Sequence, residues 1–177
     1  NKLSQFLDVL FDNNQTNGDL IQNIKEEVEA SFNQGNILQE ESKSELFINP
    51  GSLDVWININ RNEEQLWENF LVLQTISFST IKEAFDENLN QRIGETLTFI
   101  SITMKEFALK FSNGGSNYDF NQIEKVQDAL TEELIRFRST HRMRNYSLEV
   151  VEDSFVFFYQ LRKILIILGR FVPLLKN

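Results

Sequence analysis

The sequence has no cysteine, one histidine, two prolines and seven glycines among its 177 residues. Without cysteine, disulfides, thiolate metal sites and cysteine nucleophiles are excluded. Because His141 is the only histidine, zinc helices with paired histidines and di-iron bundles are excluded as well. The chain also lacks a phosphate-binding glycine loop and a Gly-x-Ser-x-Gly elbow. We therefore expect a protein that is not an enzyme and that holds no metal or cofactor.

Basic residues are scarce in the first half of the chain. The net charge is −9, which divides into −11 over residues 1–90 and +2 over residues 91–177. An acidic chain cannot neutralise a phosphate backbone, so we expect no nucleic-acid partner. The asymmetry indicates that the first half pairs with the second. No apolar run reaches the roughly 20 residues that a membrane helix needs.

The composition is that of a folded domain, with 41% hydrophobic and 24% charged residues. A chain of this length forms about one domain, which we assign to residues 1–177. The 16 phenylalanines far outnumber tyrosine and tryptophan, and this bias is typical of core packing.

The most regular stretch lies at residues 90–113. Its apolar residues recur at intervals of three and four, which places them on one face of a helix: Ile93, Leu97, Ile100, Met104, Phe107 and Phe111. Similar patterns predict long helices at residues 62–88, 91–112, 119–142 and 147–172. Short loops join these helices, so the predicted fold is all-α, with an antiparallel up-down bundle of four long helices over residues 62–177.

The last predicted helix is apolar on two sides. One side, which we expect to face the core, carries Leu148, Val151, Phe155, Phe158, Leu161, Leu165 and Leu168, and the other carries Phe157, Ile164 and Ile167. A helix with two apolar sides is either central or serves a further interface. We expect a homo-oligomer that associates through residues 147–172.

Residues 1–44 predict additional N-terminal helices, with an interruption at Gly35-Asn36. In the next segment, residues 45–61, the apolar residues follow a different spacing. Pro50-Gly51 is typical of a turn, and after it Leu53, Val55, Ile57 and Ile59 alternate with polar residues and Trp56. This period of two predicts a short extended crossing segment.

One basic cluster stands out in this acidic chain: Arg136, Arg138, His141, Arg142 and Arg144. It is open to two interpretations, an anion site that meets a lipid headgroup or acidic partner, or cations that offset a helix dipole and pair with the acidic half. Trp56 and Trp67 are likewise candidates for an aromatic contact site, or anchors of the crossing segment on the bundle.

The stretch NPGSLDVWININRNEEQLWENFLVLQTISFSTIKEAF, which ends at Phe85, combines an Asn-Pro-Gly, a Trp-containing run and an aromatic-rich helix. It resembles the segment after the membrane half of fusaric-acid-resistance-like (FUSC) and aromatic acid exporter proteins, and plant aluminium-activated malate transporters are similar there. Residues Glu95–Ala108 and the Phe-rich helix after Ser147 resemble later helices of that superfamily.

The resemblance implies a non-catalytic, soluble assembly or regulatory domain of an organic-anion or aromatic-acid exporter. Its partners would be the membrane half of the same polypeptide, further copies and an anionic lipid, on the cytoplasmic side of a membrane. The chain begins with Asn, so we expect a piece of a longer protein. The alternative function is a ligand-sensing four-helix-bundle domain of a membrane receptor.

Overall fold

The structure, a computed structural model, describes residues 2–11, 18–44, 50–115 and 117–176. In these ranges the chain is helical and contains no strand, so the predicted all-α class is confirmed. The elements are α1 (Lys2–Phe11), α2 (Gly18–Ser44), α3 (Pro50–Gln74), α4 (Phe78–Ala84), α5 (Glu87–Asn113), α6 (Gln122–Ser139), η1 (Arg142–Asn145), α7 (Leu148–Phe171) and η2 (Val172–Lys176). None of the described helices has the length and apolar character that a membrane crossing would require.

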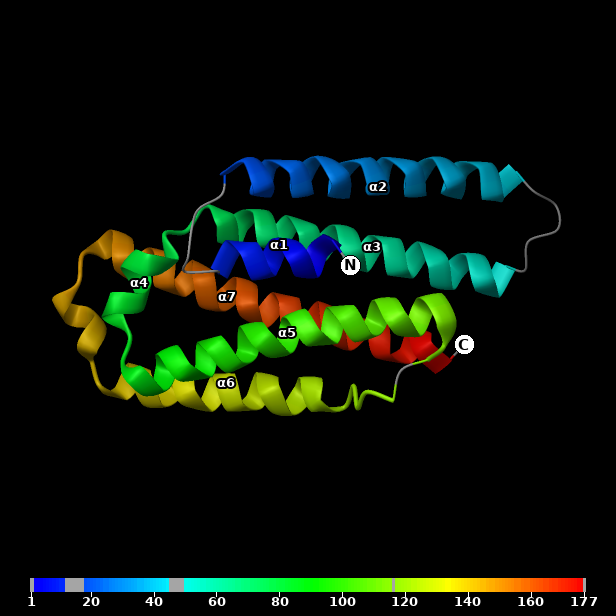
Figure 1. The fold of residues 1–177 in the computed structure, drawn as a ribbon. Coiled ribbons are helices and arrows are strands. Elements are labelled where there is room, and N and C mark those ends of the chain that lie inside the picture. Colours follow the sequence, from blue (N-terminus) through cyan, green and yellow to red (C-terminus); the bar gives the residue numbers. More distant parts are fainter. Residues whose placement is uncertain (1, 12–17, 45–49, 116, 177) are drawn as a thin grey trace.

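The long helices lie roughly along one axis, and successive ones reverse direction (Figure 1). The helix α2 lies at one edge, against α1 and α3. The short α4 crosses one end of the assembly. The helix α7 packs against α3, α4, α5 and α6, and its contact with α3 is the most extensive between any two elements. It is therefore the central helix of the fold.

Phenylalanine supplies much of the packing, as its abundance predicts. Phe6 of α1 is fully buried, and its ring centroid lies 4.8 Å from that of Trp67. Phe107 stacks on Phe120 at 4.3 Å, which joins α5 to the turn before α6. Burying one side chain of this size stabilises the fold by about 1.5–3 kcal/mol relative to exposure. The helix α1 therefore belongs to the common core.

The predicted stripe at residues 90–113 is confirmed in α5. Ile93, Leu97, Ile100, Met104 and Phe107 are all buried, whereas Phe111 at the end of the helix is 36% exposed. The helices predicted at residues 91–112, 119–142 and 147–172 correspond to α5, α6 and α7. Intervals of three and four over five turns identify a helix well because a strand cannot reproduce them.

The predicted extended segment is wrong where the structure describes it, because residues 50–61 form the first turns of α3. Residues 45–49 of that prediction lie outside the described residues. An isolated extended segment leaves its backbone N–H and C=O groups without partners, whereas a helix pairs them internally. Pro50 takes the first helical position, where its missing N–H costs nothing.

The helix predicted at residues 62–88 is also wrong in its extent. The chain leaves the helix after Gln74 and resumes it in α4 from Phe78. Thr75 Oγ1 donates a hydrogen bond to the Val72 carbonyl at 2.7 Å. Such local side-chain hydrogen bonds compete with helical ones, and β-branched residues tolerate a helix poorly.

The predicted interruption at Gly35-Asn36 does not occur, because α2 runs unbroken from Gly18 to Ser44. A glycine costs a helix only about 1 kcal/mol relative to alanine, which is too little to end one of this length.

Candidate functional site

The candidate site is built on α7, which the core holds firmly. Ser147 caps its start and accepts a hydrogen bond from the Val150 N–H at 3.4 Å. Glu149 in the first turn and Arg170 in the last complement the helix dipole. The buried face consists mainly of Phe157, Phe158, Leu161, Ile164, Leu165, Ile167, Leu168 and Phe171.

Several large apolar side chains of α7 point away from that core. Leu148 is 71% exposed, Phe155 54%, Tyr159 58% and Ile166 39%. Their spacing of seven, four and seven residues places them on one line along the helix. Ile135 of α6, 62% exposed, lines the same surface groove as Phe155 and Tyr159. These five residues form what we name the α7 stripe.

The sequence prediction that Leu148 and Phe155 face the core is wrong, because both are exposed. The second predicted apolar side is buried: Phe157, Ile164 and Ile167 all lie in the core. The apolar residues of α7 cover a wider arc than its neighbours can enclose. The surplus is the α7 stripe. The sequence prediction of a further interface did not identify its residues, because it assigned Leu148 and Phe155 to the core and placed neither Tyr159 nor Ile166.

Charge divides along α7. The acidic residues Glu149, Glu152 and Asp153 lie in its first half, and the basic residues Arg162, Lys163 and Arg170 lie in its second half. Two cations also cover aromatic rings of the α7 stripe. Arg138 lies 5.6 Å from the ring centroid of Phe155, and Lys163 lies 5.0 Å from that of Tyr159. The α7 stripe is therefore apolar, and the charged residues of α7 around it are acidic in the first half of the helix and basic in the second.

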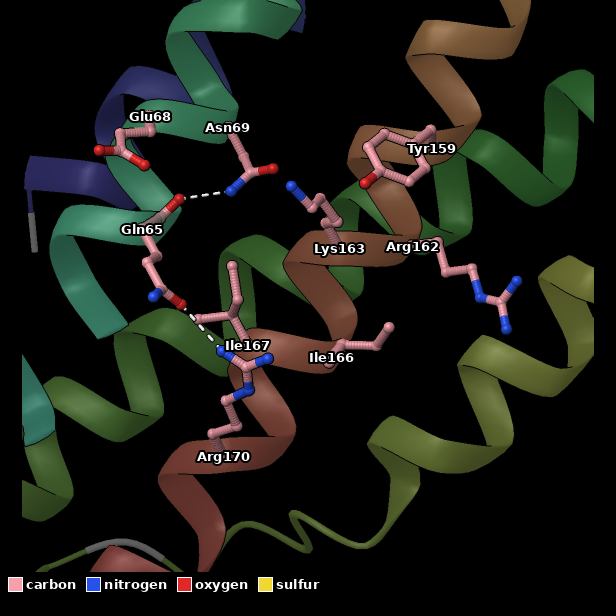
Figure 2. Close-up of a pocket in the computed structure, with 9 residues that line it drawn as sticks. All are labelled: Gln65, Glu68, Asn69, Tyr159, Arg162, Lys163, Ile166, Ile167 and Arg170. Atoms are coloured by element: carbon pink, nitrogen blue, oxygen red, sulfur yellow. Dashed lines mark hydrogen bonds between the residues drawn. The ribbon is translucent and has the colours of Figure 1, made fainter. Parts of the chain in front are cut away.

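A groove of about 510 Å³ lies between α3 and α7 (Figure 2). Its lining holds three cations, Arg162, Lys163 and Arg170, and one acid, Glu68. Arg170 Nη1 donates a hydrogen bond to Gln65 Oε1 at 2.8 Å, across the groove. The excess of cationic donors favours an anionic ligand over a cationic one.

A second groove, of about 350 Å³, lies between α6 and α7. It is more apolar, and Phe155, Phe158 and Leu134 contribute to its walls. Tyr159 and Arg162 line both grooves. Tyr159 of the α7 stripe is therefore flanked by a groove on each side.

The predicted basic cluster separates into groups with different partners. Arg136 pairs with Asp86 at 2.7 Å and also with Glu133. Arg138 covers Phe155, as described above. His141, Arg142 and Arg144 are exposed in and beside η1, and His141 adopts the left-handed conformation at φ 55°. The structure thus brings together only part of the cluster.

Asp86 stands between α4 and α5 and has two roles. Its Oδ1 accepts a hydrogen bond from the Leu89 N–H at 2.9 Å, which caps α5. Burial alone would raise its pKa, but the hydrogen bonds from Arg136 and Leu89 and the charges of Arg136 and Arg142 lower the pKa of Asp86 overall. The hydrogen bonds to Glu133 and Asp86 in turn raise the pKa of Arg136. This pairing fits the interpretation in which cations of the second half meet acids of the first.

The two tryptophans both lie on α3. Trp67 is buried against Phe6, whereas Trp56 is partly exposed. Eleven residues separate them, which is a rise of about 16 Å along a helix. They are too far apart to enclose one aromatic ring.

No group of acidic or histidine side chains among the described residues is arranged to hold a metal ion. No protein-family model, curated protein or solved structure matches this chain. The functional argument therefore depends on the surface of α7 and on the residues around it.

Proposed function

We propose that this protein is a non-catalytic assembly or regulatory domain that associates with a second copy of itself through α7. The observation that carries the proposal is the α7 stripe, in which Phe155 and Tyr159 are each more than half exposed on the central helix. Exposed apolar patches bordered by polar residues mark interaction surfaces. The seven-four-seven spacing of its α7 members matches the way helices pack against each other.

The charges of α7 favour an antiparallel pairing about a two-fold axis near Tyr159. A two-fold interface uses the same surface on both copies, so its charges must complement themselves. In this arrangement the acidic first half of each α7, with Glu149 and Glu152, lies over the basic second half of its partner, with Arg162 and Lys163. A parallel pairing would instead set like charges against each other, which is unfavourable.

The wider context of the proposal comes from the resemblance to the FUSC superfamily. The domain would lie on the cytoplasmic side of a cell membrane, joined to a membrane half of the same polypeptide that exports an organic anion or aromatic acid. The helices α3, α5, α6 and α7 would act as its rigid antiparallel bundle. The exposed His141, Arg142 and Arg144 would meet anionic lipid headgroups at one end of that bundle.

The self-association is tested by light scattering on size-exclusion eluates across a range of protein concentrations. The expected mass of the wild-type protein rises from that of one 20.8 kDa chain toward two. Phe155→Glu should keep the protein monomeric, since it places a charge in the α7 stripe. The matched control Leu38→Glu alters a side chain on α2 that is 47% exposed and should dimerise normally. A wild-type monomer at every concentration would contradict the proposal.

The second candidate function is a ligand-sensing domain, and the groove between α3 and α7 favours it (Figure 2). Its volume lies within the range of small-molecule sites, and its cations suit an organic anion. A panel of organic anions that raises the melting temperature of the wild type, but not of Lys163→Gln, would favour this function over assembly.

A further inference from the structure

A separate cavity, open to solvent on one side, lies where α1, α3, α5 and α7 meet, away from the α7 stripe. Its volume is about 330 Å³, and its walls are formed largely by apolar side chains of four helices: Leu3, Leu66, Met104, Phe107, Leu168 and Phe171. None of the five residues of the α7 stripe lines it. Any role of this cavity is therefore independent of the proposed self-association.

Glu63 is the only charged residue that lines this cavity among the described residues. Among the described residues, Ser112 supplies the other polar side chain of the lining. No described residue donates a hydrogen bond to the Glu63 carboxylate or pairs with its charge. Glu63 is half-buried, and a carboxylate that loses part of its water without gaining a partner is destabilised in its charged form. Burial accordingly raises the pKa of Glu63.

The neighbouring acids provide a contrast. Glu64 lies one residue further along α3 and accepts a hydrogen bond from Asn36 of α2 at 3.4 Å. Glu27 pairs with Lys2, and Asp8 pairs with Lys105 at 2.9 Å. These three acids thus have basic or amide partners on adjacent helices, whereas Glu63 lines an apolar cavity.

We propose that the cavity is a binding site for a small amphipathic amine, whose apolar body fills the space between the four helices and whose ammonium group pairs with the Glu63 carboxylate. The apolar walls select for a hydrocarbon body, and the single carboxylate selects for a cationic head group. A charge-assisted hydrogen bond in a partly dry site is about twice as strong as a neutral one. The cavity volume lies at the lower end of the range for ligand sites, so the ligand is small.

The test compares three probes that share one alkyl chain and differ only in head group: n-octylamine, n-octanol and sodium octanoate. Binding is measured at neutral pH by titration calorimetry, below the concentrations at which these probes form micelles. For the wild-type protein we expect octylammonium to bind at least about tenfold more tightly than octanol, and octanoate to bind more weakly still.

Two variants and a control separate the contributions of charge and space. Glu63→Gln keeps the shape of the side chain and should lower the octylammonium affinity by about tenfold, while it leaves octanol binding nearly unchanged. Ala108→Leu, on the cavity wall, should reduce the binding of all three probes because it fills the space. Glu64→Gln should bind all three as the wild type does. Circular dichroism of each variant checks that it is folded.

Three results would overturn the proposal. Octanol or octanoate could bind the wild type as tightly as octylammonium does, Glu63→Gln could leave the octylammonium affinity unchanged, or none of the probes could bind. In the first two cases the cavity would be an apolar site without head-group selection. Each of these results would leave the self-association of α7 as a separate question, because the two sites share no residue.

Discussion

Asp86 shows how a single side chain can join two helices and two halves of the chain. It caps α5 through the Leu89 N–H, and it pairs with Arg136 of α6 fifty residues later. A helix cap contributes about 1 kcal/mol. The ion pair contributes less than the cap, because solvent screens it and Arg136 is 40% exposed.

Two substitutions at Asp86 separate these roles. Asp86→Asn keeps a capping oxygen but loses the charge, so we expect a loss of about 0.5–1 kcal/mol in unfolding free energy. Asp86→Ala loses both roles and should cost about 1–2 kcal/mol. Urea unfolding followed by circular dichroism measures both losses. Equal losses for the two variants would show that Asp86 does not cap α5.

The pH dependence of this pair has a definite sign. The interactions of Asp86 lower its pKa in the folded state, so its charge stabilises the protein above the ordinary aspartate pKa. That stability is lost as the pH falls through the lowered pKa of the folded state. The difference in unfolding free energy between the wild type and Asp86→Asn should therefore narrow in acid, and a difference that widens in acid would contradict the assignment.

At the scale of elements, apolar residues at intervals of three and four correctly predict helix α5. Apolar residues at intervals of two wrongly predict an extended segment. Ile93 to Phe107 repeat over about four turns, and α5 is where they predict it. Leu53 to Ile59 alternate for only four pairs, and they lie in α3 instead. A short alternation also contains residues four apart, such as Val55 and Ile59, which share a helix face. Without a partner strand, the backbone N–H and C=O groups of this segment find partners only in a helix.

A proline at residue 58 tests the start of α3. Asn58 is exposed and lies inside the helix, with its Nδ2 donating to the Asp54 carbonyl at 2.8 Å. Asn58→Pro should cost about 3 kcal/mol or more, because it removes a helical hydrogen bond and clashes with the preceding turn. Asn58→Ala, the control, should change the unfolding free energy by less than about 0.5 kcal/mol. Equal stability of the two variants would favour the extended segment.

At the scale of the whole molecule, the sequence alone predicts the all-α class and a last helix with two apolar sides. It does not predict which residues of α7 are exposed to solvent. Phe155 and Phe157 have the same chemistry and lie two residues apart. Phe157 is 1% exposed and Phe155 is 54% exposed. That difference depends on how α3, α4, α5 and α6 surround α7, which no local pattern records. The cavity beside Glu63 was missed for the same reason, because its walls come from four separated segments.

The partners of the basic cluster likewise depend on contacts between residues that are far apart in the sequence. The sequence shows five basic residues between Arg136 and Arg144, and it shows an acidic first half. It does not show that Arg136 meets Asp86 while Arg142 and Arg144 stay at the surface. Only the packing of η1 and α6 beside the α4–α5 junction distinguishes them.

The most direct measurement of the central claim, antiparallel pairing through α7, is oxidative cross-linking of single-cysteine variants. The chain has no cysteine of its own, so each introduced thiol is the only one present. Tyr159→Cys places a thiol near the proposed two-fold axis, where the two copies lie within the distance that a disulfide spans. In the same arrangement, Leu148→Cys places the two thiols about 33 Å apart along the helices.

We predict rapid cross-linking of Tyr159→Cys into a dimer, and slow cross-linking of both Leu148→Cys and the α2 control Ile37→Cys. Rapid cross-linking of Tyr159→Cys and Leu148→Cys together would indicate a parallel pairing and contradict the charge argument. If Tyr159→Cys cross-links no faster than Ile37→Cys, the proposed self-association through α7 is wrong.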